Sequence, residues 1–207
     1  MEREKNNFDR SLEDVGNVQL LEHVNLTVPD QSVASMFYVT GLGFTRDPYI
    51  DFGSLNMWIN LGEQQFHMPT NQALVLRGHS GVVVQDLDEL GARLKFAARG
   101  LHDTAFKSIE GDNCLDLTCP FGNHIKAFAP ASFPRMDLGM PYVQFDVPPA
   151  TSAGIARFYT EVLGCPCQHD NDTTQVAMGH NQKLIFKETD APLPAYDGHH
   201  IAIYLAN

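Results

Sequence analysis

The sequence predicts an α+β protein built from tandem modules, each with one strand, one helix and three further strands. Three observations predict this class. Apolar residues alternate over short stretches that glycine, proline and aspartate interrupt, which is typical of strands. Segments with apolar residues at helical spacing lie between these stretches. The third observation is an internal repeat.

The repeat consists of three pairs of similar segments. The clearest pair is FYVTGLGF and FYTEVLGC. The pairs are 24–30 with 143–149, 37–44 with 158–165, and 78–84 with 199–205. The first pair lies 119 positions apart and the other two lie 121 positions apart. Because three matches share nearly one spacing, we interpret them as a duplication.

The expected elements follow from this pattern. In the first module we expect a strand over 21–28, a helix over 33–41 after an Asp30 N-cap, and strands over 43–50, 55–61 and 63–69. In the second we expect a strand over 78–85, a helix over 87–99 capped by Asp86, and strands over 104–109, 113–119 and 123–129. In the third we expect a helix over 151–163, strands over 165–170, 174–178 and 182–188, and a further strand over 199–207. Aspartate is a favoured N-cap because its carboxylate accepts from free backbone N–H groups.

The expected domain organisation has four parts. They are a flexible N-terminal tail (1–17), paired modules (18–72 and 73–130), a linker (131–140), and a third module with the first strand of an incomplete fourth (141–207). A second copy as long as the first would need roughly 44 more residues, so we expect the fourth module to be unfinished.

Composition excludes several classes of function. The chain has 14 Lys and Arg against 25 Asp and Glu, a formal net charge of −11. This charge repels nucleic acid and anionic lipid, so we expect neither as a partner. No apolar run approaches a membrane span, and the charged N-terminus does not resemble a secretion signal. We therefore expect a cytoplasmic protein whose four cysteines are plain thiols.

Four motifs resemble those of one known superfamily. EHVNLTVPD with FYVTGLGF resembles the opening strand and helix of a vicinal oxygen chelate module, the module of glyoxalases, bleomycin-resistance proteins and extradiol dioxygenases. GHSGVVVQDLDEL resembles the opening of a partner module, LTCPFGNHIKAF its closing strand, and MPYVQFDVPP a third opening. The resemblance covers about residues 18–207 and implies βαβββ modules that form cup-shaped mixed sheets.

The resemblance also implies a metal centre. In this superfamily the first and last strands of facing modules supply the ligands, which correspond here to His23, His67 and His79. Three imidazoles leave open positions on a divalent ion such as Fe, Zn, Ni or Mn. The corresponding positions of the second copy, Tyr142, Lys187 and His200, would chelate poorly.

One position departs from the family pattern. Lys126 stands where a glutamate ligand is usual. An ammonium repels a nearby dication, so three interpretations stay open. Lys126 points away from the metal, acts as a neutral catalytic base, or holds an anionic ligand at a site without metal. His124, two residues earlier on the same strand face, is a candidate substitute ligand.

Three residues are candidates for substrate contact. Asn25 shares the strand face of His23, and Trp58 and Phe128 are candidates to line the cup. Their alternative roles are a solvated sheet position for Asn25 and plain core packing for the two aromatic residues.

Three functions are compatible with these residues. The first is a metal-dependent lyase, isomerase or ring-cleaving dioxygenase that acts on a small oxygenated substrate, with Lys126 as a base or anion contact. The second is a metal-free small-molecule-binding protein of the bleomycin-resistance type. The third is a scaffold whose repeats serve assembly. A homodimer through the uncovered edge of the unfinished module is a further expectation.

Overall fold

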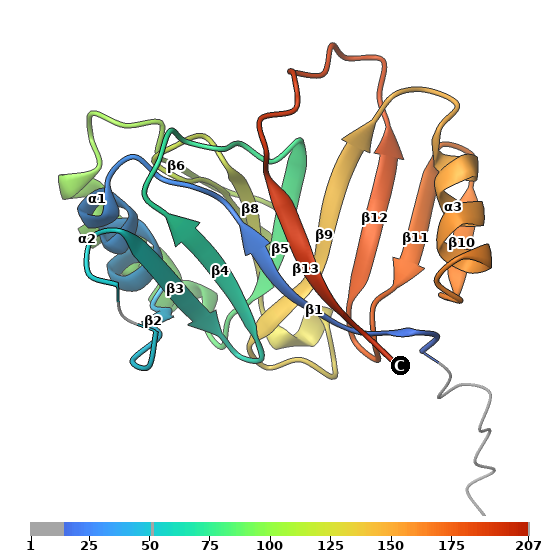
Figure 1. The fold of residues 1–207 in the computed structure, drawn as a ribbon. Coiled ribbons are helices and arrows are strands. Elements are labelled where there is room, and N and C mark those ends of the chain that lie inside the picture. The colour runs from blue at the N-terminus through green and yellow to red at the C-terminus, as the bar shows by residue number, and fades with distance from the viewer. Residues whose placement is uncertain (1–14, 51, 207) are drawn as a thin grey trace, which may run out of the picture.

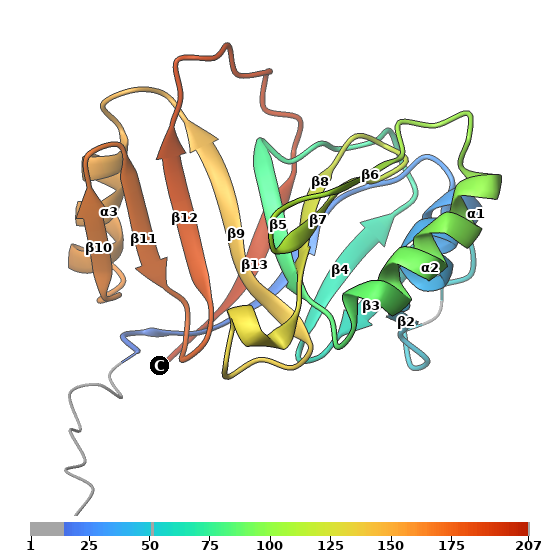
Figure 2. The ribbon, with the colours of Figure 1, turned by 180° about the vertical axis from the view of Figure 1, so that it is seen from behind.

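Two mixed sheets form the framework of the protein (Figures 1 and 2). The computed structural model describes residues 15–50 and 52–206, and in this part of the chain thirteen strands are present. The five-stranded sheet has the order β13-β1-β4-β3-β2, and the eight-stranded sheet has the order β10-β11-β12-β9-β5-β8-β7-β6. The α+β class with mixed sheets is therefore confirmed.

The five-stranded sheet contains the first module. Its strands are β1 (Val18–Asn25), β2 (Thr45–Arg46), β3 (Asn56–Leu61), β4 (Gln64–Pro69) and β13 (His200–Leu205), and its helical segment is α1 (Gln31–Ser35) followed by the π-helix η2 (Met36–Gly41). The strand expected over 43–50 is only two residues long. The Asp47 carboxylate accepts from the backbone N–H groups of Tyr49 and Ile50, and this local turn competes with strand pairing.

The eight-stranded sheet contains the second and third modules. Its strands are β5 (Gly78–Val83), β6 (Lys107–Glu110), β7 (Cys114–Thr118), β8 (His124–Phe128), β9 (Gly139–Val147), β10 (Cys167–Asp170), β11 (Thr173–Ala177) and β12 (Lys183–Glu188). Its helices are α2 (Leu87–Ala97), η3 (Ala98–Gly100), η4 (Pro130–Ser132) and α3 (Ser152–Glu161). Asp30 and Asp86 cap α1 and α2 as expected, because each carboxylate accepts from two backbone N–H groups of the first turn.

The pairing of modules differs from the expected one. The segments 18–72 and 73–130 do not share a sheet. Strand β5 pairs antiparallel with β9, which joins the second module to the third, and β1 pairs antiparallel with the terminal strand β13. The first two modules instead meet through their helices, where a Cβ at Gly41 would lie 3.4 Å from the Cβ of Ala97. Helix packing, rather than strand pairing, joins these two modules.

One continuous core joins the two sheets. It includes side chains from both of them, such as Leu21 and Phe66 of the five-stranded sheet and Leu117 and Leu184 of the eight-stranded sheet. Most of the expected N-terminal tail, residues 1–14, lies outside the described residues. The Asn17 carbonyl accepts from the Ala206 backbone N–H at 2.7 Å. No helix in the described residues is long and apolar enough to span a membrane.

A glycine at the centre of the eight-stranded sheet allows the modules to join closely. Gly81 of β5 is paired with Tyr142 of β9, and the Tyr142 ring lies directly over it. A Cβ at Gly81 would lie 2.3 Å from Cε1 of Tyr142, closer than two carbon atoms can approach. Only glycine therefore fits this position without displacement of the tyrosine.

We expect Gly81→Ala to destabilise the protein by about 1–3 kcal/mol, because the added methyl group overpacks the contact with Tyr142. Gly91→Ala is the matched control, since nothing lies within 4 Å of a Cβ at Gly91 on helix α2. That control should stabilise the protein by about 0.5–1 kcal/mol, the usual gain in a helix interior. Urea denaturation followed by circular dichroism measures both changes. Equal stability of the two variants would contradict the assigned contact.

Candidate functional site

A β-bulge in β1 places an acid and an imidazole on the same side of the five-stranded sheet. The pairing of β1 with β13 shifts register between Leu21 and His23, while Leu21 and Val24 both remain fully buried in the core. The intervening Glu22 and His23 therefore both leave the core side. The Glu22 carboxylate contacts Nδ1 of His23, and the two side chains are 19% and 13% exposed.

A polar row crosses this sheet beside the bulge. Strand register aligns Trp58, His67, Asn25 and His200 on four neighbouring strands. The rings of Trp58 and His67 stack with centroids 3.8 Å apart and an interplanar angle of 11°. His23 meets the same two rings edge-on, at centroid distances of 5.0 Å and 5.5 Å. The structure thus brings His23, His67, Asn25 and Trp58 together.

Two asparagines occupy both ring nitrogens of His67. Asn25 Nδ2 lies 2.6 Å from Nδ1, and Asn56 Nδ2 lies 3.0 Å from Nε2. A neutral imidazole has one N–H and one acceptor, so one of the amides must present its oxygen instead. The buried Oδ1 of Asn56 has no hydrogen-bond partner, so turning the Asn56 amide breaks no hydrogen bond of that oxygen. In this assignment His67 Nε2–H donates to Asn56, and Nδ1 accepts from Asn25.

His67 is neutral at pH 7. Burial, and then the neighbouring His23 and His200, lower its pKa from 6.5 to about 4. A buried imidazole loses solvation on protonation, so its uncharged form is favoured. The neutral form fits the hydrogen bonds with the two asparagines.

His79 lies on the other sheet. It belongs to β5, where it aligns with His124 of β8 and Gln144 of β9. Its Nε2 is 3.1 Å from the Tyr142 hydroxyl, and the two rings meet edge-on. Burial and then Lys126 lower the pKa of His79 to about 4, while burial raises the pKa of Tyr142 well above its usual value. Both groups are therefore uncharged at pH 7.

Lys126 shares this face of the eight-stranded sheet. Strand register places Tyr142, Gly81, Lys126 and Asp116 in one row across β9, β5, β8 and β7. The Lys126 ammonium is 3.6 Å from the Asp116 carboxylate, with both side chains more than 40% exposed. We call this face the open face, because the opposite face of the sheet is part of the hydrophobic core and contacts α2 and α3.

A hollow of about 540 Å³ lies on the open face. His79, Lys126 and Asp116 line it together with other polar residues of strands β6 to β9. The remaining polar residues are Lys107, Thr118, His124 and Asp146. Phe128 lies on this sheet too, with its ring centroid 5.3 Å from that of Phe133 and 6.2 Å from that of Tyr142. The lining of the hollow therefore combines donors, acceptors and two lysines.

These positions do not fit the expected metal centre. His23 and His67 lie on one sheet, whereas His79 lies on the other and bonds to Tyr142. Within the described part of the chain, no group of three or more His, Cys, Asp and Glu side chains is placed to hold a metal ion. The sheet topology is the physical reason, since β5 joins β9 instead of the sheet that contains β1 and β4. The structure does not bring His23, His67 and His79 to one point.

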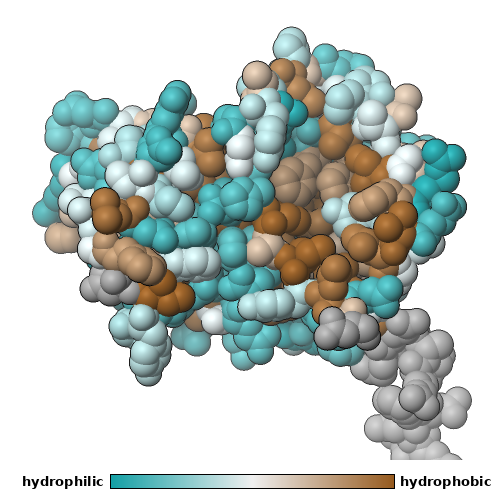
Figure 3. Space-filling model, viewed as in Figure 1, coloured by the Kyte–Doolittle hydropathy of each residue, from teal (hydrophilic) through white to brown (hydrophobic). Residues whose placement is uncertain are grey.

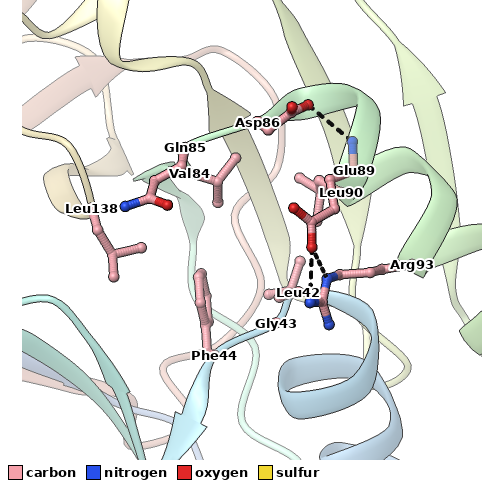
Figure 4. Close-up of a pocket in the computed structure, with 10 residues that line it drawn as sticks. All are labelled: Leu42, Gly43, Phe44, Val84, Gln85, Asp86, Glu89, Leu90, Arg93 and Leu138. Atoms are coloured by element: carbon pink, nitrogen blue, oxygen red, sulfur yellow. Dashed lines mark hydrogen bonds and ion pairs between the residues drawn. The ribbon is translucent and has the colours of Figure 1, made fainter.

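A second pocket lies where the first two modules meet, and none of the expected site residues lines it (Figure 4). Its volume is about 230 Å³, and its apolar side chains are Leu42, Phe44, Val84, Leu90 and Leu138. The Arg93 guanidinium at its rim donates twice to the Glu89 carboxylate, at 3.0 Å and 2.9 Å. Because that ion pair is exposed and already satisfied, Arg93 gives little reason to expect a charged ligand in this pocket.

Sequence reasoning missed Glu22, Asn56 and Asp116 as parts of these clusters. The Glu22–His23 contact depends on the bulge, for which the sequence shows one sign: the apolar residues Leu21 and Val24 are three positions apart, whereas a regular strand places residues of one face two apart. No comparable pattern in the neighbouring sequence marks Asn56 or Asp116 as part of a cluster. Their roles follow from strand register, which a single sequence does not specify.

Comparisons with known proteins agree on the fold. No family model and no curated protein matches the chain. Among solved structures, a presumed dioxygenase of Bacillus subtilis shares 13% identity over 92% of this chain and 69% of its own, with a TM-score of 0.56. Glyoxalase I of Zea mays shares 13% identity over 88% of this chain and 71% of its own, with a TM-score of 0.58. Its V278E variant shares 12% identity over 93% and 75%, with a TM-score of 0.60.

At such identities the likeness shows the fold rather than an activity. It agrees with the resemblance of the motifs and with the two mixed sheets described above. This chain has the fold of the presumed dioxygenase and of maize glyoxalase I.

Proposed function

We propose that this protein binds a small organic anion in the hollow of the open face, without a chelating metal ion. The observation that supports this most directly is the position of Lys126 beside the hydrogen-bonded His79 and Tyr142, at the edge of a hollow large enough for a small molecule. Small-molecule sites usually combine an apolar wall with a few polar groups that converge. This proposal is the metal-free alternative of the sequence analysis.

Lys126 is suited to hold the anionic group of the ligand. Its ion pair with Asp116 is 3.6 Å long and substantially exposed, so it contributes at most about 1 kcal/mol. A ligand carboxylate or phosphate can therefore compete with Asp116 for Lys126. A charge-assisted hydrogen bond to the ligand would be stronger than this exposed pair.

His79 and Tyr142 are suited to the uncharged oxygen atoms of the ligand. Their mutual hydrogen bond of 3.1 Å fixes the imidazole, and neither group carries charge at pH 7. Phe128 and Phe133 supply aromatic surface near Tyr142. We therefore expect an anion with an apolar or aromatic part to bind better than a bare inorganic ion.

A second candidate function is the metal-dependent lyase, isomerase or dioxygenase. The likeness to maize glyoxalase I favours it. For this function, a divalent ion such as Fe, Zn, Ni or Mn would have to bind His23, His67 and His79 together. His79 lies on a different sheet from the other two histidines. Asn25 and Asn56 would also have to release a ring nitrogen of His67. The residues do not fit a metal in this arrangement, so we assign no catalytic step to one.

The first test uses benzoate as an anionic probe and benzamide as its uncharged analogue. We expect saturable benzoate binding, measured by isothermal titration calorimetry, and roughly ten- to a hundredfold weaker binding to Lys126→Gln, because a bond to a charged group contributes about 1.5–3 kcal/mol. Lys95→Gln on the exposed side of α2 is the control and should bind as the wild type does. The proposal fails if benzamide binds as tightly as benzoate or if Lys126→Gln has no effect.

The second test follows from the lowered pKa values of His67 and His79, which are about 4 in the folded protein against 6.5 for an ordinary histidine. Between these pH values the unfolded chain binds more protons than the folded chain, so stability falls as pH decreases from about 7 to 4. We expect Tm to decrease by several degrees over this range, and by less in His79→Gln. His102→Gln, at a side chain that is 71% exposed, is the control. An equal decrease of Tm in the wild type, His79→Gln and His102→Gln would contradict the role assigned to the burial of His79.

The third test separates the two candidate functions. We expect protein purified without chelators to contain substoichiometric metal by elemental analysis, at a level that His67→Ala leaves unchanged. Nitrogen NMR of His67 at pH 7 should show a proton on Nε2 and an unprotonated Nδ1, as the Asn56 assignment above predicts. Stoichiometric metal that His67→Ala removes would instead establish the metal-dependent candidate.

A further inference from the structure

Opposite charges line the hollow of the open face on the two sides of strand β5. Both lysines of the hollow, Lys107 of β6 and Lys126 of β8, lie on one side, together with Asp116, and Asp146 of β9 lies on the other. The His79 imidazole of β5 is near both kinds of charge, since Lys126 lowers its pKa whereas Asp146 raises it. The hollow therefore offers a cation and a separate anion with a neutral imidazole between them.

The Asp146 carboxylate lacks a cationic partner. Gln144 Nε2 donates to it at 3.1 Å, and it forms no ion pair in the part of the chain that the structure describes. Arg77 adjoins it in the sheet, since the Asp146 backbone N–H donates to the Arg77 carbonyl at 2.8 Å. The Arg77 guanidinium lies instead over the Tyr196 ring, 5.8 Å from its centroid. A half-buried carboxylate without a cation is unfavourable, and a cationic group of a ligand would relieve this cost.

The wall of the hollow next to Asp146 is polar. Strand β9 turns Tyr142, Gln144 and Asp146 to the open face, because alternate residues of a strand share a face. On the opposite side of the sheet, apolar side chains gather between strand β13 and helix α3 (Figure 3), and Phe145 stacks on Phe186 with centroids 5.6 Å apart. The open face is therefore the side of this sheet that suits a ligand with charged groups.

We propose that the ligand of the hollow is a zwitterion, with its acid group bound to Lys126 and an ammonium group bound to Asp146. This inference rests on the proposed function and adds the class of ligand to it. The ammonium group forms the ion pair that Asp146 lacks, while the acid group competes with Asp116 for Lys126. Each end of the ligand then makes a charge-assisted hydrogen bond.

The two charges of such a ligand must be well separated. Strands β8 and β9 are two strand spacings apart, which is about 10 Å, with β5 between them. An α-amino acid is too short to reach both Lys126 and Asp146 across this width. An amino acid whose ammonium and carboxylate groups lie at opposite ends of an aromatic ring or an alkyl chain fits the arrangement better, and its spacer lies against His79.

The test compares para-(aminomethyl)benzoate with para-ethylbenzoate, which has nearly the same shape and the same acid group but no ammonium. In isothermal titration calorimetry of the full chain at pH 7, we expect the aminomethyl compound to bind roughly tenfold more tightly, because it alone pairs with Asp146. Asp146→Asn should bind the two compounds with nearly equal affinity, because a neutral amide forms no ion pair. Asp103→Asn is the matched control, at a side chain that is 88% exposed and outside the hollow, and it should keep the wild-type preference.

The results distinguish this inference from the proposed function. Equal affinity of the wild type for the two compounds, or a preference that Asp146→Asn retains, would overturn the zwitterion assignment. The anion site would still stand in that case if benzoate binding depends on Lys126. If neither benzoate nor para-ethylbenzoate binds, the proposed function fails and the zwitterion assignment fails with it.

Discussion

The antiparallel pairing of β5 with β9 determines the arrangement of every candidate site. It joins two modules into the eight-stranded sheet and lays Tyr142 over Gly81. It also carries His79 away from the sheet that contains His23 and His67. A single choice of strand partner thus replaces one three-histidine centre with two separate clusters, each of which satisfies its own imidazoles.

The same physical effect keeps His67 and His79, one imidazole in each cluster, uncharged. Burial favours the uncharged form of His67 and of His79, and each imidazole then finds uncharged hydrogen-bonding partners. For His67 these partners are two asparagine amides, and for His79 it is the hydroxyl of Tyr142. The charged pair of Lys126 and Asp116, by contrast, is more than 40% exposed. Under the proposed function, this distribution would let the open face exchange an ion pair with a ligand while the imidazoles stay fixed.

The sequence allowed most of the fold to be predicted, but not the association of its parts. Helix caps at Asp30 and Asp86 and the strand positions follow from local patterns, which depend on residues close together in the chain. The partner of β5 depends on contacts between distant segments, and no local pattern encodes that choice. The bulge at Glu22 and His23 could be predicted in part. The spacing of Leu21 and Val24 indicates a bulge, but only the pairing with β13 shows which side chains share a face.

Comparison of the two repeats shows why sequence identity between copies does not fix their environment. Phe37 and Phe158 occupy equivalent positions in similar segments, but only Phe37 has a helix across from it. The change from Gly41 to Val162 has accompanied this difference, since a glycine permits the close contact with Ala97 that a valine would prevent. The apolar character of the second segment is retained where no helix of the described chain uses it.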